Sequence, residues 1–190
     1  MSVLRLCLRH GYDEHGTEYP GPRHDHNLNP RYTTLHRRMI RRLLTRYGPP
    51  DIIIYSPFLR TRQTAYLIIE VIREKYPSHP GSLIIDNRIA RYFNGAEQLD
   101  PSIASATDHY DPPLRESKTA FTARIHEYVD HDNSHYRDNT VWTITHALVY
   151  KRIARYVNVE VPATIPFLDH FPYSVPPLAG ERLVHPTLLP

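Results

Sequence analysis

Short apolar runs alternate along the chain with longer segments in which apolar residues recur at helical spacing. The runs have the length and the β-branched content of buried strands, and the longer segments are typical of helices with one apolar face. The predicted strands cover residues 2–7, 51–55, 83–86 and 140–145, and the predicted helices cover residues 32–47, 57–75, 117–131 and 147–156. This alternation predicts an α/β fold, a three-layer α/β/α sandwich with a mainly parallel central sheet.

The chain has 190 residues, of which 41% are hydrophobic, so we expect residues 1–190 to form a single domain. Two stretches stand outside the alternation. Residues 88–113 are irregular and rich in Asp and Pro, and we expect them to fold over the ligand site as a lid. The proline-rich tail, residues 162–190, offers an edge strand at 164–168 and then a segment laid over the surface.

The first predicted strand is followed by a histidine. Residues 8–11 read Leu-Arg-His-Gly, and this motif comes directly after the apolar run. At the carboxyl end of a strand in an open α/β sheet, side chains point into the crevice where ligands bind, and Gly11 allows a sharp turn and a close approach there. A neutral imidazole is a nucleophile, and the guanidinium of Arg9 lowers its pKa and binds phosphate oxygens. The pair indicates phosphoryl transfer to His10, with a chance strand cap as the alternative.

A second segment joins a strand to a helix through Ser56 and Pro57. Proline suits the first helical turn, and Ser56 is a good N-cap. Arg60 then lies in the first turn, where free backbone N–H groups and the helix dipole favour an anion and a guanidinium reinforces a phosphate site. Taken alone, Arg60 is also explained as a solvated surface residue and Ser56 as a simple cap.

A third segment, residues 139–147, repeats the arrangement of the first, because an apolar run delivers His146 at its end. Two strand-terminal histidines and two arginines together make one coherent pocket. We therefore expect His10, His146, Arg9 and Arg60 to lie close together.

These motifs, in this order and spacing, resemble the histidine phosphatase, or phosphoglycerate-mutase-like, superfamily. The resemblance runs from about residue 3 to about residue 157. It is carried by Arg9-His10-Gly11, the Ser-Pro-x-x-Arg-x-x-Gln-Thr-Ala run at 56–65, the stretch from Glu116 to Arg124, and Thr145-His146-Ala147, with weaker agreement at Asp86-x-Arg88-Ile89. The run at 56–65 is the most specific of these, since it fixes several residues at once.

The resemblance implies that His10 is the nucleophile that forms a phosphohistidine. It also implies that Arg9, Arg60 and His146 clamp the transferring phosphoryl group. In phosphoryl transfer the protein mainly positions the reactants and neutralises the equatorial oxygens, which two guanidinium groups and an imidazole can do without a metal. We therefore expect a metal-independent phosphatase of phosphate monoesters or related phosphoryl compounds, with water as the acceptor and no cofactor.

The sequence departs from the superfamily at the proton donor. Active members commonly place a glutamate after the Asp-x-Arg-Leu strand, whereas the matching position here holds Arg91. Ala147 likewise replaces the aspartate that other members have after the second histidine. Loss of a general acid costs on the order of 10² to 10⁴ in rate, most for poor leaving groups. Aryl phosphates, phosphoanhydrides and phosphohistidine suffer least.

Several carboxylates are candidates for the missing proton donor. They are Asp13 and Glu14, just after the histidine turn, and Glu97 and Asp100, beyond the altered strand end. Glu116 belongs instead to a helix start at Ser117. Arg91 is either a further phosphate contact, which selects a multiply phosphorylated or anionic substrate, or a surface residue of a degraded site.

The same departure supports a second hypothesis, a catalytically impaired phosphate-binding or scaffolding pseudophosphatase in which the pocket persists. Turnover of an aryl phosphate separates the two hypotheses. A mutase is disfavoured, because the mutase-sized insertions and the acid are lacking. The phosphatase hypothesis implies a phosphorylated small molecule or a phosphoprotein as the partner, and the oligomeric state stays open.

Five arginines gather in residues 36–46, in a chain with a net charge of +3 and a pI near 9.0. Met39, Ile40, Leu43 and Leu44 recur there at helical spacing, so the arginines are predicted to form the solvated side of an amphipathic helix. Nucleic acid is therefore not the expected partner. A nucleic-acid-associated regulator or an anionic-membrane binder is the alternative that this charge leaves open.

Thirteen histidines invite a metal site, most of all at His24-x-His26 and at His131 and His135. Neither pair has cysteine partners or a zinc-protease pattern, so no metal site is expected. Cys7 lies inside the first apolar run and is expected to be a small buried hydrophobe. No apolar stretch approaches the roughly 20 residues of a membrane span, and no signal-like core is present, so we expect an intracellular, cytoplasmic protein, with a nuclear location left open.

Overall fold

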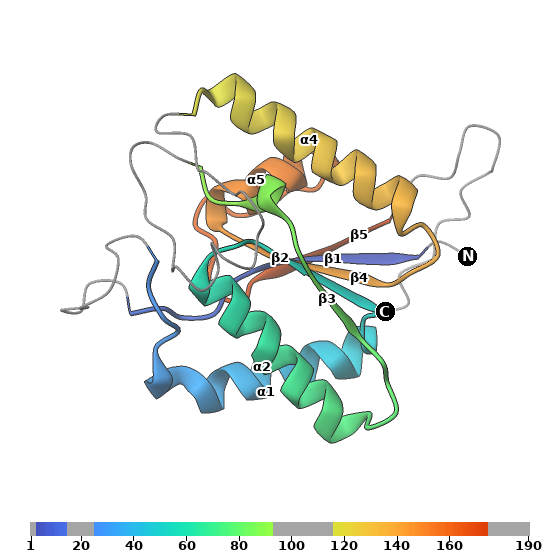
Figure 1. Cartoon of the computed structure of the whole chain (residues 1–190). Helices are drawn as coiled ribbons and strands as arrows, with labels where there is room; N and C mark the ends of the chain where they lie inside the picture. Colours follow the sequence, from blue (N-terminus) through green and yellow to red (C-terminus); the bar gives the residue numbers. More distant parts are fainter. Residues whose placement is uncertain (1–2, 15–24, 93–115, 175–190) are drawn as a thin grey trace.

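The computed structural model describes residues 3–14, 25–92 and 116–174, which are coloured in Figure 1. A five-stranded sheet runs through these residues in the order β3-β2-β4-β1-β5. The strands are β1 (Leu4–Arg9), β2 (Ile52–Tyr55), β3 (Ser82–Ile85), β4 (Val141–Thr145) and β5 (His170–Ser174). The first four are parallel to one another, and β5 pairs antiparallel with β1 at one edge. The mainly parallel sheet that the sequence predicts is confirmed.

Helices cover both faces of this sheet (Figure 1). On one face lie α1 (Thr33–Tyr47) and α2 (Leu59–Lys75), and on the other lie α4 (Lys118–His135) and α5 (Ala147–Tyr156). Short 3₁₀ turns precede α1 and follow β3, as η1 (Pro30–Tyr32) and η2 (Asn87–Ile89). The predicted three-layer α/β/α architecture is thereby confirmed. In the part of the chain that the structure describes, no helix has the length and apolar character needed to cross a membrane.

Side-chain alternation along the strands divides the core into two layers. Leu6 of β1 and Ile53 of β2 belong to the layer shared with α1 and α2. Cys7 and Ile54 point to the opposite face and belong to the layer shared with α4 and α5. Cys7 is fully buried, as the sequence predicts, and burial raises the pKa of its thiol well above the usual value.

The arginine-rich helix α1 turns an apolar stripe of Ile40, Leu43 and Leu44 toward the sheet. Its exposed side is formed by Arg38, Arg41, Arg42 and Arg46. Arg37 makes ion pairs with two glutamates of α2. The prediction of a solvated arginine face is confirmed.

Helix α2 begins later than the sequence predicts. The expected N-cap is Ser56, but Phe58 occupies that position and the helix starts at Leu59. The physical reason is Asp25, whose Oδ1 accepts the N–H of Leu59 at 2.6 Å and so caps the helix from a distant part of the chain. The Ser56 hydroxyl contacts His146 instead.

The edge strand lies at His170–Ser174 and not at residues 164–168, where the sequence predicts it. Residues 165–169 turn against the end of β1, and Leu168 has a φ of 55°, which ends any extended run. There the N–H of Leu168 donates to the His10 carbonyl at 3.2 Å, and the N–H of Arg9 donates to the Asp169 carbonyl at 3.0 Å. Pro172 is tolerated inside β5 because an edge strand is paired on one side only.

Parts of the predicted lid and tail lie outside the described residues. Of the predicted lid at 88–113, residues 88–92 are described, and they form the end of η2 and the chain that leaves it. Residues 93–113, which include Glu97 and Asp100, are not among them, nor are residues 175–190 of the tail. These expectations stay predictions.

Helix α4 starts as predicted, with the Ser117 side chain accepting the N–H of Ala120 at 3.0 Å, and it runs on to His135, beyond the predicted end at residue 131. A buried side chain of the core holds this added turn of α4 in place. Arg5 of β1 is fully buried, and its Nε donates to Asp132 Oδ2 at 3.0 Å. The same guanidinium donates to three carbonyl groups at the end of α4 and just after it. A buried cation in a strand thus determines where this helix ends.

We expect Arg5→Leu to lower the free energy of unfolding by about 3 to 5 kcal/mol, because it leaves the buried Asp132 carboxylate without its charged partner. Urea unfolding followed by circular dichroism measures the change. The double variant Arg5→Leu/Asp132→Leu removes both charges and should recover part of the loss. A loss below about 1 kcal/mol in the single variant, the range of an exposed ion pair, would contradict this view of Arg5.

Candidate active site

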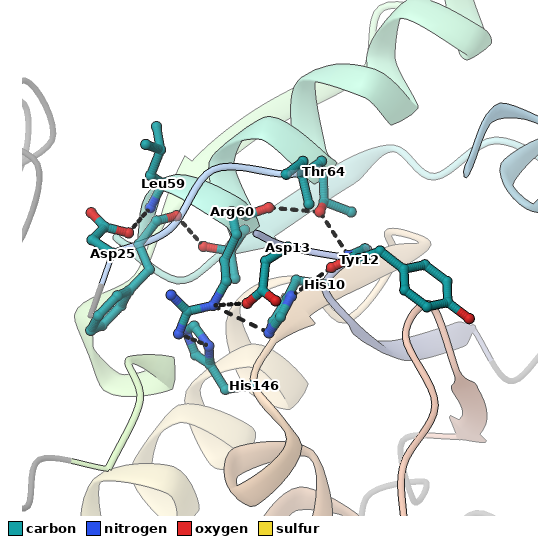
Figure 2. A network of polar contacts seen from close by, with 12 residues as sticks. His10, Tyr12, Asp13, Asp25, Leu59, Arg60, Thr64 and His146 are labelled. Carbon is teal, nitrogen blue, oxygen red and sulfur yellow. Dashed lines mark hydrogen bonds and ion pairs between the residues drawn. The ribbon is translucent and has the colours of Figure 1, made fainter. Parts of the chain in front are cut away.

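Three of the predicted site residues converge at the carboxyl ends of the central strands. His10 follows β1, His146 follows β4, and Arg60 stands in the first turn of α2, directly after β2. Each of the three is 4% exposed. Their side chains point toward one another (Figure 2), because neighbouring parallel strands end at the same edge of the sheet.

Arg60 bridges the two imidazole rings. Its Nε lies 3.3 Å from Nε2 of His10, and its Nη2 lies 3.1 Å from Nδ1 of His146. The ring centroids of the two histidines are 5.4 Å apart. A single guanidinium therefore organises both rings, and its donors lie where a phosphoryl group on His10 would have its oxygens.

Hydrogen bonds fix the tautomers of both rings. Nδ1 of His10 lies 2.8 Å from the carbonyl oxygen of Gly11, which can only accept, so Nδ1 carries the proton and Nε2 the lone pair. Nδ1 of His146 accepts from Arg60, so its Nε2 is the donor to the Ser56 hydroxyl at 2.8 Å. Both rings are neutral in this arrangement, and His10 presents an unprotonated Nε2 to the centre of the cluster.

Burial holds the pKa values of His10 and His146 well below the ordinary 6.5. The positive charge of Arg60 is the next largest cause for both rings, and Arg9 and Arg91 lower both pKa values further. The sequence predicts that Arg9 lowers the pKa of His10. In the structure the main causes of the lowered pKa are burial and Arg60. An imidazole that stays neutral is available as a nucleophile.

Arg9 lies between this cluster and the turn at 165–169. Its Nη1 donates to the carbonyl of Ile165, and the centre of its guanidinium lies 3.9 Å from the centroid of the Phe167 ring. Its Nε is buried and has no hydrogen-bond partner among the described residues. Because a buried donor without a partner costs about 1 to 3 kcal/mol, Arg9 is suited to receive an anion.

Asp13 brings a carboxylate to the cluster. Its Oδ2 lies 3.6 Å from Nε of Arg60, the nitrogen that also contacts His10, and its side chain is 9% exposed. Figure 2 shows the Asp13 carboxylate directed toward Arg60 and His10. Glu14, the next residue, donates its backbone N–H to Asn27 at 3.0 Å.

Two residues that the sequence did not single out for the site bind the backbone that follows His10. His36, buried in α1, accepts the N–H of Tyr12 at 2.9 Å through Nε2. Thr64 of α2 accepts the N–H of Gly11 at 3.1 Å and donates to the Arg60 carbonyl at 2.7 Å. Thr64 belongs to the Gln-Thr-Ala run of the motif, but no pattern in the sequence pairs His36 with a turn 24 residues earlier.

Gly11 is required for space rather than for an unusual backbone angle. A Cβ on this residue would lie 3.0 Å from two atoms of the His36 ring. Its φ is outside the left-handed region, unlike those of Gly48 and Gly81. Gly11 therefore allows the backbone to approach His36 closely, and the close approach to a ligand stays a prediction.

Comparison with known proteins rests on structure, since no protein-family model and no curated protein matches the sequence. YhfR from Bacillus stearothermophilus superimposes with a TM-score of 0.64 at 18% identity over 90% of each chain. A mycobacterial glucosyl-3-phosphoglycerate phosphatase gives 0.59 at 16% identity, again over 90% of each chain. The alpha-ribazole phosphatase from Shigella flexneri gives 0.58 at 18% identity, over 83% of this chain and 81% of its own. The chain has the phosphoglycerate-mutase-like fold.

Within this fold, the segment that carries Arg91 is firmly held. The guanidinium of Arg124 donates to the carbonyls of Arg88, Ala90 and Arg91, at 2.5 to 3.0 Å. Glu116, itself buried, accepts from Arg124 through both carboxylate oxygens, at 2.5 and 2.9 Å. Glu116 thus holds the Arg124 side chain in place beside the start of α4. Because Arg124 binds the carbonyls around Arg91, the charge of Arg91 acts on both histidines from a fixed backbone.

The histidine pair His131 and His135 stacks on one side of α4, with ring centroids 4.9 Å apart. Among the described residues, no group of three or more His, Cys, Asp or Glu side chains is arranged to hold a metal ion. His26 of the other candidate pair is described, and His24 is not.

We expect His10 and His146 to stay neutral as the pH falls through 6.5, because burial and Arg60 lower both pKa values. Imidazole ¹⁵N NMR measures the midpoints, and His10→Ala assigns the signals. The unfolded chain binds more protons than the folded one below pH 6.5, so folding stability falls there as the pH decreases. A His10 midpoint at or above 6.5 in the folded protein would contradict this electrostatic picture.

Proposed function

We propose that the protein is a metal-independent phosphatase that acts on phosphate monoesters or related phosphoryl compounds through a phosphohistidine on His10. The observation that carries this proposal is the neutral, buried imidazole of His10, whose Nε2 lies 3.3 Å from the Arg60 guanidinium. A nucleophile beside a buried cation suits attack on a phosphorus atom whose oxygens are negative. The histidine phosphatase fold supports the same class of reaction at a coarser level.

In the first step, Nε2 of His10 forms a bond to phosphorus while the bond to the leaving oxygen breaks. Arg60 and Arg9 bind the equatorial oxygens, and an incoming anion takes over the Arg60 donors that contact the two imidazoles. The ring centroid of His146 lies 5.4 Å from that of His10, and His146 completes the set of side chains around the phosphoryl group. In the second step, water attacks phosphorus, the bond to Nε2 breaks, and inorganic phosphate leaves.

Asp13 is our candidate for the proton transfers of both steps. In its protonated form it gives a proton to the leaving oxygen, and as the resulting carboxylate it takes one back from the attacking water, the two roles that a glutamate at the Arg91 position would otherwise have. Its place beside Arg60, in contact with the same Nε as His10, supports this assignment. Glu14 stays a second candidate by sequence position alone.

The competing hypothesis is a phosphate-binding pseudophosphatase. Arg91 favours it, since an arginine cannot donate a proton at neutral pH. Both hypotheses predict phosphate binding at Arg9 and Arg60, so binding does not separate them. Turnover that depends on His10 separates the two hypotheses.

We expect the wild-type protein to hydrolyse phenyl phosphate with metal chelated between pH 5 and 8, and His10→Ala to lower kcat/KM by about 10⁴-fold or more. The release of inorganic phosphate measures both. Circular dichroism of His10→Ala checks that the fold is intact. A well-folded wild type that binds phosphate but shows no turnover would instead establish the pseudophosphatase.

We expect Asp13→Asn to lower kcat for an alkyl phosphate by about 10²-fold or more, and for phenyl phosphate by much less, because the poor leaving group needs the proton. Glu14→Gln, which changes the adjacent carboxylate in the same way, tests the second candidate, and we expect it to leave both values near those of the wild type. Equal losses for both substrates, or the same loss in Glu14→Gln, would remove Asp13 from the proton-transfer role.

A further inference from the structure

The peptide unit between Gly11 and Tyr12 lies between two imidazole rings. Its carbonyl oxygen accepts from Nδ1 of His10 at 2.8 Å, and its N–H donates to Nε2 of His36 at 2.9 Å. Because a peptide unit is planar, its C=O and N–H groups turn together, so a hydrogen bond at one end fixes the direction of the other. His36 of α1 is therefore linked to the proposed nucleophile through a single peptide unit.

The His36 ring is held in this position by its surroundings. It is 1% exposed and lies in the first turn of α1. The Tyr12 ring lies nearly parallel to it, at 5.8 Å between centroids and 16° between planes, and the Tyr32 ring lies 6.4 Å away, between centroids. Gly11 leaves room for the ring, since a Cβ there would lie 3.0 Å from two of its atoms. These contacts keep Nε2 of His36 at the N–H of Tyr12.

The preceding peptide unit, which joins His10 to Gly11, has different partners. Its carbonyl oxygen accepts the N–H of Leu168 at 3.2 Å, and its N–H donates to Oγ1 of Thr64 at 3.1 Å. These two bonds hold the main chain beside His10, but the His10 ring bonds to the next carbonyl, that of Gly11. The orientation of the His10 ring therefore depends on the peptide unit that His36 binds.

The hydrogen-bond roles along this chain of groups follow from the chemistry of each. A backbone N–H can only donate, so Nε2 of His36 carries the lone pair and its Nδ1 carries the proton. Burial lowers the pKa of His36 from the ordinary 6.5, which keeps this acceptor unprotonated at neutral pH. Hydrogen bonds in a chain polarise one another, so the bond to His36 makes the Gly11 carbonyl a stronger acceptor for Nδ1–H of His10. A stronger bond at Nδ1 raises the basicity of Nε2 of His10.

We propose that His36 is a positioning residue that holds His10, through the Gly11–Tyr12 peptide unit, in the orientation and tautomer that direct the Nε2 lone pair at phosphorus. This deepens the proposed function and rests on it. Without an acceptor at residue 36, the N–H of Tyr12 loses its partner, and the peptide unit is free to rotate toward another one. Rotation takes the Gly11 carbonyl away from Nδ1 of His10.

The His36 contact matters most during the reaction itself. Nε of Arg60 also donates to Nε2 of His10, at 3.3 Å, and so supports the same tautomer. In the proposed first step the oxygens of the substrate take over this donor. From that point the hydrogen bond to the Gly11 carbonyl fixes the ring, and an Nε2 that carried the ring proton instead could not attack phosphorus.

Four variants separate the hydrogen bond from the packing of residue 36. His36→Leu removes the acceptor at similar volume. His36→Gln places an amide oxygen near the position of Nε2, whereas His36→Asn, shorter by one methylene group, cannot reach the Tyr12 N–H. Leu44→Ala is the control for lost packing, because Leu44 is 1% exposed in the same helix and packs in the core layer shared by α1, α2 and the sheet. Circular dichroism checks that each variant folds, and the Gln and Asn pair tests the proposal even if His36→Leu does not fold.

Rapid quenching with excess phenyl phosphate measures the rate of phosphohistidine formation on His10. We expect His36→Leu and His36→Asn to lower the maximal rate by about 10²-fold, because a misplaced nucleophile loses the alignment of the attack. The phenyl phosphate concentration at half-maximal rate should change little, since Arg9 and Arg60 bind the phosphoryl group. His36→Gln should recover most of the loss, and Leu44→Ala should keep the wild-type rate. Equal rates in His36→Gln and His36→Asn would overturn the proposal.

NMR of the Nδ1–H proton of His10, assigned with His10→Ala, tests the proposal without turnover. We expect a slowly exchanging signal in the wild type, Leu44→Ala and His36→Gln. Exchange with water should be faster in His36→Leu and His36→Asn, because the hydrogen bond to Gly11 is loosened. Exchange unchanged in all variants would overturn the role of His36 and, where phosphohistidine forms on His10, leave the phosphatase standing. If no variant forms phosphohistidine, the phosphatase is overturned and this signal alone decides whether His36 holds the His10 ring.

Discussion

The contact on which the site depends is that of one buried guanidinium with two neutral imidazoles. Arg60 reaches both His10 and His146, and each of the three side chains is 4% exposed. Burying a cation is costly unless it is hydrogen-bonded and compensated. The unprotonated nitrogens of the two rings supply acceptors, and Asp13 places a carboxyl oxygen 3.6 Å from Nε of Arg60. The arrangement keeps Nε2 of His10 unprotonated and holds positive charge beside it, the two conditions that the proposed attack on a phosphate ester requires.

The surrounding structure serves to hold this contact. Asp25 caps α2 at Leu59 and so fixes the turn that carries Arg60. His36 and Thr64 fix the backbone that follows His10. The turn at 165–169 closes over the end of β1 and adds the Phe167 ring beside Arg9. His10 is thus held by α1, α2 and the turn at 165–169 at once, which explains how a buried and electrostatically costly cluster keeps a single geometry.

Sequence patterns predicted the parts of this site that strand and helix periodicity control. His10 and His146 follow strands that end at one edge of a parallel sheet, and Arg60 follows the next strand, so their meeting was predictable. The capping of α2 was not, because Asp25 comes from a loop and replaces the local cap at Ser56. The edge strand was misplaced for a similar reason. The hydrogen bonds of residues 165–169 with Arg9 and His10 are tertiary contacts without a periodic signal.

The central claim is that the phosphoryl group passes through Nε2 of His10. Rapid mixing of the wild-type protein with phenyl phosphate, followed by an alkaline quench that preserves phosphohistidine and by mass spectrometry of the peptides, tests this directly. We predict phosphate on the peptide that contains His10, formed at least as fast as steady-state turnover and lost as inorganic phosphate appears. Turnover with no phosphorylated His10 at any time, or with phosphate on another residue that forms and decays at the rate of turnover, would contradict it.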